Sequence, residues 1–198
     1  MMELSTQSFT FVISLAAVVN GLGIVRLLSS FAEYLRRRQD FEIQHYWVFS
    51  LFACLQLLVH VLLWWSFWGI RQAPPFNFLF YIFLLSGPTF VYLATSVLMP
   101  DVSGRTFDLK QVYFAVRRSY FTLMSLTWLW AILIRPLLDG TVAPSTPIFA
   151  LFLICALVLR FTHNARVHVV MAVFHWLLMM VFIGMFGMHL GAQAGQSG

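Results

Sequence analysis

The chain has 198 residues, of which 61% are hydrophobic and only 10% are charged. A domain that folds in water carries about 25% charged residues, so this composition excludes a water-soluble globular protein and predicts a surface that meets lipid. The net charge of +5 comes from basic residues that lie mostly between apolar segments. No basic face remains outside these loops, and we therefore expect no binding of nucleic acid.

Six apolar segments reach or approach the roughly 17–25 residues that a membrane-spanning helix needs. They predict one transmembrane domain, 1–198, built as an all-α bundle of six helices with short loops. The predicted spans are 9–28, 46–68, 76–98, 119–138, 147–162 and 167–190, and the fifth is the shortest.

The basic residues predict how this bundle sits in the membrane. Ten of the 12 lysine and arginine residues fall on one side of the predicted spans, and only Arg71 and Arg135 fall on the other. Positive charge is retained in the cytoplasm, so both termini are expected outside. Glu3, with no basic residue before the first apolar segment, is unlike the start of a cleaved signal peptide, and we expect that segment to be a retained span.

Two arginine clusters flank predicted spans on the inner side. They are Arg36, Arg37 and Arg38 after the first span, and Arg117 and Arg118 at the start of the fourth. Such clusters predict contact with anionic lipid headgroups or with a protein partner. In the first span, Ala17 and Gly21 have the small-xxx-small spacing that lets a neighbouring helix approach closely.

Polar and helix-interrupting residues inside the spans predict a binding site. Pro88 removes a backbone donor, and such breaks occur at transporter binding sites. A polar side chain well inside a span usually faces the bundle and is a candidate functional group. The predicted ligand-binding residues are Asn20, Gln56, His60, Pro88 and His175.

The histidines also allow a metal or haem site. His45 and His168 predict axial ligands of one haem b near the inner surface, and His175 with Met179, one turn apart, predicts a soft site for copper. His60 and His175 are excluded as a haem pair because a rise of ~1.5 Å per residue places them about 12 Å apart in depth.

Local signals fix two helix ends. Asp108 has the position of an N-cap, with Gln111 three residues later. Pro136 is expected to end the fourth helix, because its ring cannot continue the hydrogen-bond ladder. Cys54 and Cys155 lie in apolar segments without CxxC spacing and are expected to pack as small hydrophobic residues.

No sequence signature of a hydrolase, a nucleotide-binding loop or a zinc peptidase is present in the chain. No aspartate or glutamate lies deep in a predicted span, although proton-coupled carriers typically relay through buried carboxylates. We therefore assign no catalytic residue and expect a protein that is not an enzyme.

Several short motifs resemble a family of small, uncharacterised polytopic proteins of the bacterial inner membrane. The similar residues are Ile13-Ser14, Gly21-Leu22-Gly23-Ile24, Leu63-Trp64-Trp65, Tyr92-Leu93-Ala94, Leu98-Met99-Pro100-Asp101, Asp108-Leu109 and Arg117-Arg118. They cover the first four predicted helices. The resemblance implies a location in the bacterial inner membrane and brings no activity or binding residue.

Three functional hypotheses follow. The first is a bundle that binds or transports a small molecule or ion. The second is an accessory subunit that packs against a larger membrane complex. The third is a haem b or copper protein. The expected partners are the lipid bilayer and either another membrane protein or a homo-oligomer.

Overall fold

A computed structural model of the chain describes residues 2–37, 42–67, 77–99 and 106–187. These residues form six α-helices. They are α1 (Met2–Arg37), α2 (Trp47–Phe67), α3 (Phe78–Leu98), α4 (Leu109–Asp139), α5 (Thr146–Phe161) and α6 (Ala165–Phe182), and a π-helical turn, Ile183–Gly187, follows α6. The predicted all-α bundle is confirmed.

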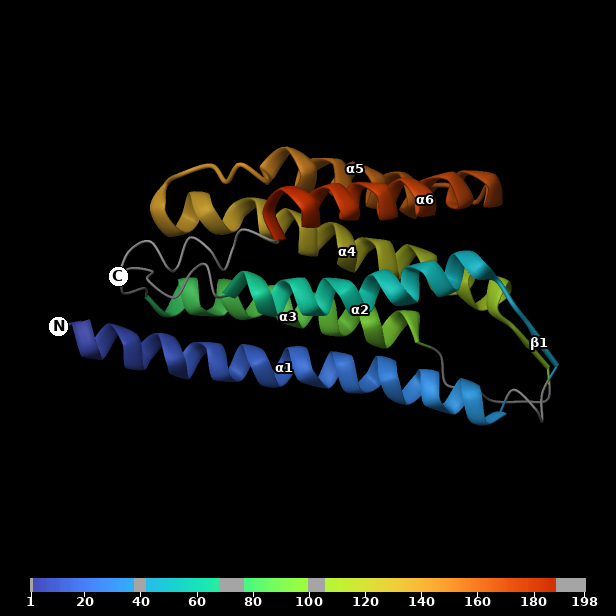
Figure 1. The fold of residues 1–198 in the computed structure, drawn as a ribbon, viewed down its shortest axis with the longest axis horizontal. Coiled ribbons are helices and arrows are strands. Elements are labelled where there is room, and N and C mark those ends of the chain that lie inside the picture. The colour runs from blue at the N-terminus through green and yellow to red at the C-terminus, as the bar shows by residue number, and fades with distance from the viewer. Residues whose placement is uncertain (1, 38–41, 68–76, 100–105, 188–198) are drawn as a thin grey trace.

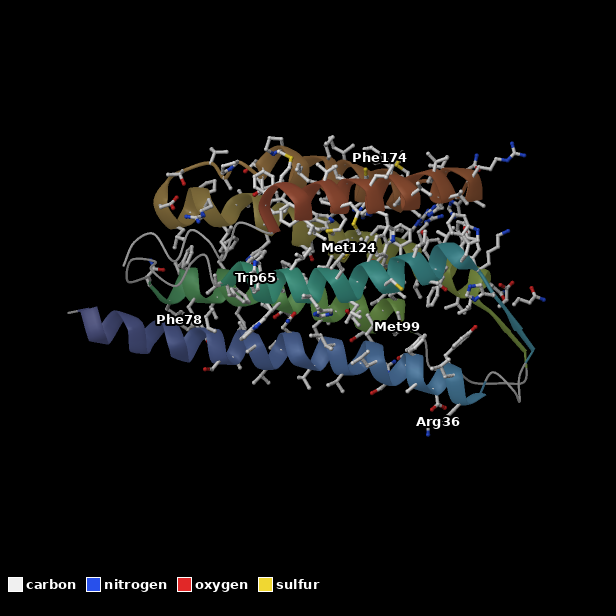
Figure 2. The ribbon with its side chains drawn as sticks, viewed as in Figure 1. Arg36, Trp65, Phe78, Met99, Met124 and Phe174 are labelled. Carbon is white, nitrogen blue, oxygen red and sulfur yellow. The ribbon has the colours of Figure 1, made fainter. Side chains whose placement is uncertain are left out.

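The helices lie side by side and alternate in direction (Figure 1). α1 packs against α3 and α2, α3 packs against α4, and α4 packs against α5, with α6 beside α5 and α2. Figure 2 shows Phe174 on the outer face of α6 and Met124 in the interior, and these side chains are 40% and 2% exposed. Apolar side chains therefore cover both the outside and the core, as expected of a bundle in lipid.

Five helices are long and apolar enough to cross a membrane, and the described protein is a multi-pass membrane protein on this criterion. The candidate spans are Ile13–Arg36, Trp47–Phe67, Phe78–Leu98, Leu109–Asp139 and Ala165–Phe186. α5 is apolar but has only 16 residues, which at ~1.5 Å per residue gives about 24 Å. This is shorter than the ~30 Å hydrocarbon core, so the fifth of the six predicted spans falls below that length.

A short pair of parallel strands joins the α1–α2 and α3–α4 connections at one end of the bundle. β1 (Glu42–Gln44) pairs with β2 (Thr106–Asp108), and Ile43 lies opposite Phe107. Nothing in the sequence predicted this pairing, because three-residue strands carry too short a pattern to be recognised. The strands lead directly into the starts of α2 and α4 and so set the positions of both helices.

For α4, the predicted start is confirmed and the predicted end is wrong. Asp108 is the N-cap of α4, and its carboxylate accepts hydrogen bonds from the backbone nitrogens of Lys110 and Gln111 at 2.8 and 3.2 Å. Pro136 does not end α4, which continues to Asp139. Gly140 ends it instead, in the left-handed conformation with φ 72° that glycine adopts without strain.

The predicted break at Pro88 is also wrong, because α3 is one continuous helix across it. The indole of Trp130 lies over Gly87, where an added Cβ would meet the ring at 2.4 Å. Trp130 Nε1 donates to the carbonyl of Phe83 at 2.8 Å, and the Ser86 hydroxyl donates to the same oxygen at 2.7 Å. Both bonds go to the Phe83 carbonyl, one residue before the Leu84 carbonyl that Pro88 leaves without a helical donor. The bond from Trp130 ties α4 to α3 beside the proline.

Candidate functional site

A buried polar network crosses the middle of the bundle and connects four helices. Its side chains are Asn20 from α1, Gln56 and His60 from α2, Thr95 from α3 and Tyr120 from α4, and each is at most 3% exposed. Three of the five predicted ligand-binding residues, Asn20, Gln56 and His60, are brought together here.

The pairing of Asn20 with His60 holds α1 against α2. Asn20 Nδ2 donates to the backbone carbonyl of His60 at 3.2 Å, which fixes the orientation of the amide. Asn20 Oδ1 then faces His60 Nδ1 at 2.7 Å. Because this amide oxygen can only accept, Nδ1 carries the proton of the imidazole.

Thr95 links His60 to Gln56 and to its own helix. Its hydroxyl oxygen lies 2.8 Å from His60 Nε2, and it accepts from Gln56 Nε2 at 3.1 Å. The same hydroxyl lies 3.0 Å from the Val91 carbonyl, to which Gln56 Nε2 also donates at 3.1 Å. The Tyr120 hydroxyl completes the chain by donating to Gln56 Oε1 at 3.1 Å.

The imidazole of His60 packs against the backbone of α1 at Gly23. A Cβ at this position would lie 2.2 Å from His60 Cε1, so only glycine fits. By contrast, a Cβ added to Gly21 would meet nothing within 4 Å. Within the described chain the close approach is therefore made at Gly23 and not at Gly21, and a partner helix at Ala17 and Gly21 stays a prediction.

Pro88 and His175 are buried, but no hydrogen bond joins them to this network within the described residues. The His175 ring packs against Phe152 and Phe52 at centroid distances of 5.0 and 5.9 Å. Its Nδ1 atom is buried without a hydrogen-bond partner in the described part of the chain. The five predicted residues therefore do not form one site.

A second polar cluster lies between the start of α4 and the turn that joins α5 to α6. His168 Nε2 lies 3.1 Å from the carbonyl of Thr162, which only accepts, so this nitrogen carries a proton. His168 Nδ1 then accepts from the Tyr113 hydroxyl at 2.7 Å. Arg117 is 1% exposed and contacts His163 Nε2 at 3.1 Å through Nη2.

Some polar atoms of this second cluster have no partner. In the described part of the chain, Arg117 Nε, Arg117 Nη1 and the Tyr46 hydroxyl are buried without a hydrogen bond. Tyr46 packs against Tyr113 with ring centroids 5.6 Å apart, and burial raises the pKa of its hydroxyl. This cluster therefore retains unused hydrogen-bonding capacity.

The predicted contacts of the basic residues with lipid or a partner stay a prediction, and the structure shows only which of these arginines are exposed. Arg36 is 76% exposed and pairs with Glu33 at 2.7 Å, and Figure 2 shows it pointing away from the bundle. Arg118 is exposed. Arg117, however, is 1% exposed and contacts His163 in the α5–α6 turn, so it does not lie on the open surface, and its contact with lipid or a partner stays a prediction. The side chains of Arg37 and Arg38 lie outside the described residues.

The predicted metal residues do not gather. No group of three or more histidine, cysteine, aspartate or glutamate side chains is placed to hold a metal within the described residues. His45 lies 3.5 Å from the Ser50 hydroxyl, whereas both ring nitrogens of His168 are hydrogen-bonded. His168 could ligate a haem iron only by losing one of these bonds. His175 and Met179 are both buried on α6, one turn apart.

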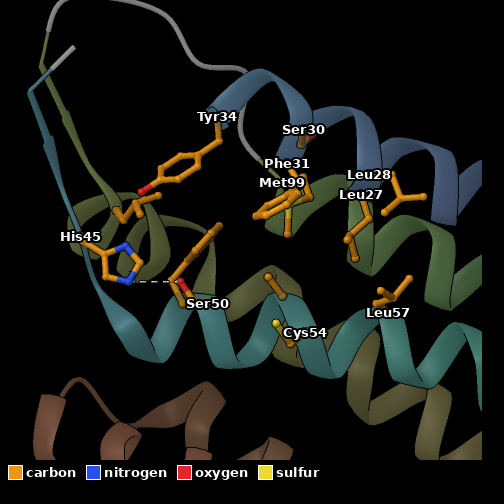
Figure 3. A pocket seen from close by; sticks show the side chains of 13 residues that line it. Leu27, Leu28, Ser30, Phe31, Tyr34, His45, Ser50, Cys54, Leu57 and Met99 are labelled. Atoms are coloured by element: carbon orange, nitrogen blue, oxygen red, sulfur yellow. Dashed lines mark hydrogen bonds between the residues drawn. The ribbon is translucent and has the colours of Figure 1, made fainter. Parts of the chain in front are cut away.

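An apolar groove of 320 Å³ runs between α1 and α2. Figure 3 shows Leu27 and Leu57 at one end and Tyr34 and His45 at the other, with the thiol of Cys54 between them. Its remaining lining residues are Leu28, Ser30, Phe31, Phe49, Ser50, Ala53, Met99 and Leu109. Leu28 and Phe31 are 49% and 56% exposed, so the groove opens to the outside of the bundle. Sequence patterns missed it, because a groove depends on how two helices diverge.

Comparison with protein-family models, curated proteins and solved structures gives no match to this chain. The resemblance of the first four helices to a bacterial inner-membrane family therefore stays a prediction.

Proposed function

We propose that this protein acts by binding rather than by catalysis, and that its ligand is a single-chain amphiphile held in the groove between α1 and α2. The observation that carries the proposal is the groove itself, whose 320 Å³ volume lies at the lower end of the ~300–1,000 Å³ range of ligand pockets. Both helices that form its walls are candidate membrane spans, so its open side faces the bilayer.

The distribution of polar groups along the groove favours an amphiphile. Tyr34, His45 and Ser50 lie together at one end, and mostly apolar side chains, aliphatic and aromatic, form the rest of the lining. An apolar chain fits the aliphatic part, and a headgroup with hydrogen-bonding atoms fits the polar end.

Selectivity must come from the polar end and from shape. A chain that leaves the lipid phase gains little from the hydrophobic effect, because lipid tails are as apolar as the groove. Hydrogen bonds to a headgroup and close packing around the chain distinguish a ligand from bulk lipid. Tyr34 suits this role, since its hydroxyl makes no hydrogen bond to another described residue.

Photocrosslinking tests the proposal. Protein in phosphatidylcholine nanodiscs is irradiated with a diazirine-labelled palmitate, and the modified residues are mapped by mass spectrometry. We expect saturable labelling around Phe49–Leu57 that unlabelled palmitate displaces. Ala53→Phe, which fills the groove, should abolish it, whereas Val61→Phe on the exposed face of the same helix should not. Labelling spread evenly over all lipid-facing helices, or insensitive to Ala53→Phe, would contradict the proposal.

The expected location of the protein is the bacterial inner membrane, with both termini outside. The concentration of basic residues at the end that carries the strands supports this orientation. A C-terminal alkaline phosphatase fusion should then be active in cells, and a C-terminal green fluorescent protein fusion should be dark. The opposite result would require the reversed orientation or an odd number of spans.

A further inference from the structure

Arg117 is a buried cation without a buried anion. Its side chain is 1% exposed, and among the described residues its hydrogen bond runs from Nη2 to His163 Nε2 at 3.1 Å. The imidazole nitrogen that accepts this bond carries no proton, so His163 does not neutralise the guanidinium. In the described residues, no carboxylate lies within ion-pair distance of Arg117, and Nε and Nη1 have no partner.

The neighbouring polar groups cannot supply what Arg117 lacks. The Tyr113 hydroxyl, one helical turn before it, is engaged with His168 Nδ1 at 2.7 Å, and His168 Nε2 is engaged with Thr162. A buried charge that is neither paired nor fully hydrogen-bonded is strongly unfavourable. An anionic hydrogen-bond acceptor would therefore pair both the charge and the free N–H groups of Arg117.

The guanidinium is arranged to bind such an acceptor through two nitrogens. Nη2 has two protons, and His163 engages one of them. The other proton forms a fork with Nε or with Nη1, whichever lies on that side, and both of these nitrogens are free of partners. A guanidinium fork matches the two oxygens of a phosphate.

His163 places this fork at one end of the bundle. It lies in the exposed turn between α5 and α6, at the end of the bundle where the exposed Arg118 and Arg166 also lie. Its contact with Nη2 therefore holds the guanidinium at the end of the bundle that meets the membrane interface, where phosphate groups of lipids lie.

We propose that Arg117 and His163 form a binding site for a phosphate group. The phosphodiester of a membrane phospholipid and free inorganic phosphate offer the same chemistry, and the interfacial position makes the lipid the expected source. This site is separate from the α1–α2 groove and does not depend on the amphiphile proposed there.

Binding is measured by native mass spectrometry on the full chain purified in a neutral detergent. Dioctanoyl phosphatidylglycerol is titrated in one arm and sodium phosphate in the other, at matched ionic strength. We expect saturable binding of one phosphatidylglycerol that Arg117→Met weakens at least tenfold and His163→Ala weakens several-fold. Arg118→Gln, which removes the adjacent exposed charge, and Ala53→Phe, which fills the groove, should change it by less than twofold.

The outcomes separate the sources and decide the proposal. Binding of the lipid alone, or binding of inorganic phosphate that competes with the lipid, supports the site and identifies its ligand. Absence of saturable binding in both arms overturns it, as does an equal loss in Arg117→Met and Arg118→Gln, which would indicate diffuse attraction. If Arg117→Met does not fold, as judged by circular dichroism, His163→Ala carries the test, because its side chain is exposed.

Discussion

The network around His60 and the cluster around Arg117 differ in whether their buried polar atoms have hydrogen-bond partners. Around His60, both ring nitrogens, both ends of Asn20 and both ends of Gln56 have partners within hydrogen-bond distance. Around Arg117, two guanidinium nitrogens have none among the described residues.

This difference separates a structural connection from a binding site. In the network around His60 each side-chain nitrogen and oxygen already has a partner within hydrogen-bond distance, so a ligand that enters it competes with existing bonds. Such networks rigidify a core and select one arrangement of its helices. An incompletely paired cluster has the free donors that a ligand requires. We expect the network around His60 to hold its helices together, whereas the ligand-binding role predicted for its residues stays a prediction. The buried atoms without partners lie in the cluster around Arg117.

The first prediction breaks the network at its centre. His60→Ala removes a ring that is 0% exposed and leaves Asn20 Oδ1 without its donor. The cavity and the orphaned polar group together should lower the free energy of unfolding by about 4 kcal/mol. Reversible unfolding in mixed detergent micelles measures this change. A loss below about 1 kcal/mol would mean that the network does not hold α1 in place.

The second prediction compares two glycines on one helix. Gly23→Ala places a methyl group 2.2 Å from His60 Cε1, and the overpacking should cost about 1–3 kcal/mol. Gly21→Ala meets nothing within 4 Å and should be neutral or stabilising by up to about 1 kcal/mol, since alanine is the better helix former. The same unfolding assay compares the two variants. Equal effects would contradict the close contact between α1 and the imidazole.

Features of the fold and the site could be predicted from the sequence where the signal lies within one segment of the chain. Apolar length predicted all six helices, and charge with spacing predicted the N-cap Asp108, because both signals are local. Asn20, Gln56 and His60 were identified because polar residues in a span must face the bundle. Thr95 escaped selection, since a threonine in a helix usually bonds its own backbone. Here its hydroxyl lies 3.0 Å from the Val91 carbonyl and 2.8 Å from His60 Nε2, and because Nδ1 carries the imidazole proton, the single hydroxyl proton goes to Nε2.

Other features depend on packing between distant segments and had no sequence signal. Arg117 and Arg118 are adjacent arginines at a helix entrance, and the sequence does not show that only the first lies beneath a turn formed 45 residues later. Gly21 and Gly23 likewise differ only in the face of α1 that they occupy. The groove arises from the divergence of two helices, and neither helix contains it alone.

The third prediction tests the link between Thr95 and His60 without removing the ring. Thr95→Val keeps the shape of the side chain and removes the hydroxyl, which leaves His60 Nε2 and one Gln56 donor unpaired. We expect a loss of about 1–2 kcal/mol in the free energy of unfolding. Thr95→Ser, which keeps the hydroxyl, should recover most of it. If serine and valine destabilise equally, the methyl packing of Thr95 matters more than its hydrogen bonds.

The fourth prediction has the smallest expected effect on stability, and it tests directly whether Arg117 differs from His60. Arg117→Met replaces the buried arginine by an unbranched apolar side chain and removes its uncompensated charge. Replacing buried charge by apolar side chains of similar volume is often neutral or stabilising, so the free energy of unfolding in lipid-free detergent should fall by less than about 1 kcal/mol or should rise. Addition of dioctanoyl phosphatidylglycerol should stabilise the wild-type chain and leave Arg117→Met unchanged, because only a ligand that binds the folded state shifts unfolding. A large loss without lipid would show instead that Arg117 is a structural group like His60. The contrast between the two regions would then disappear.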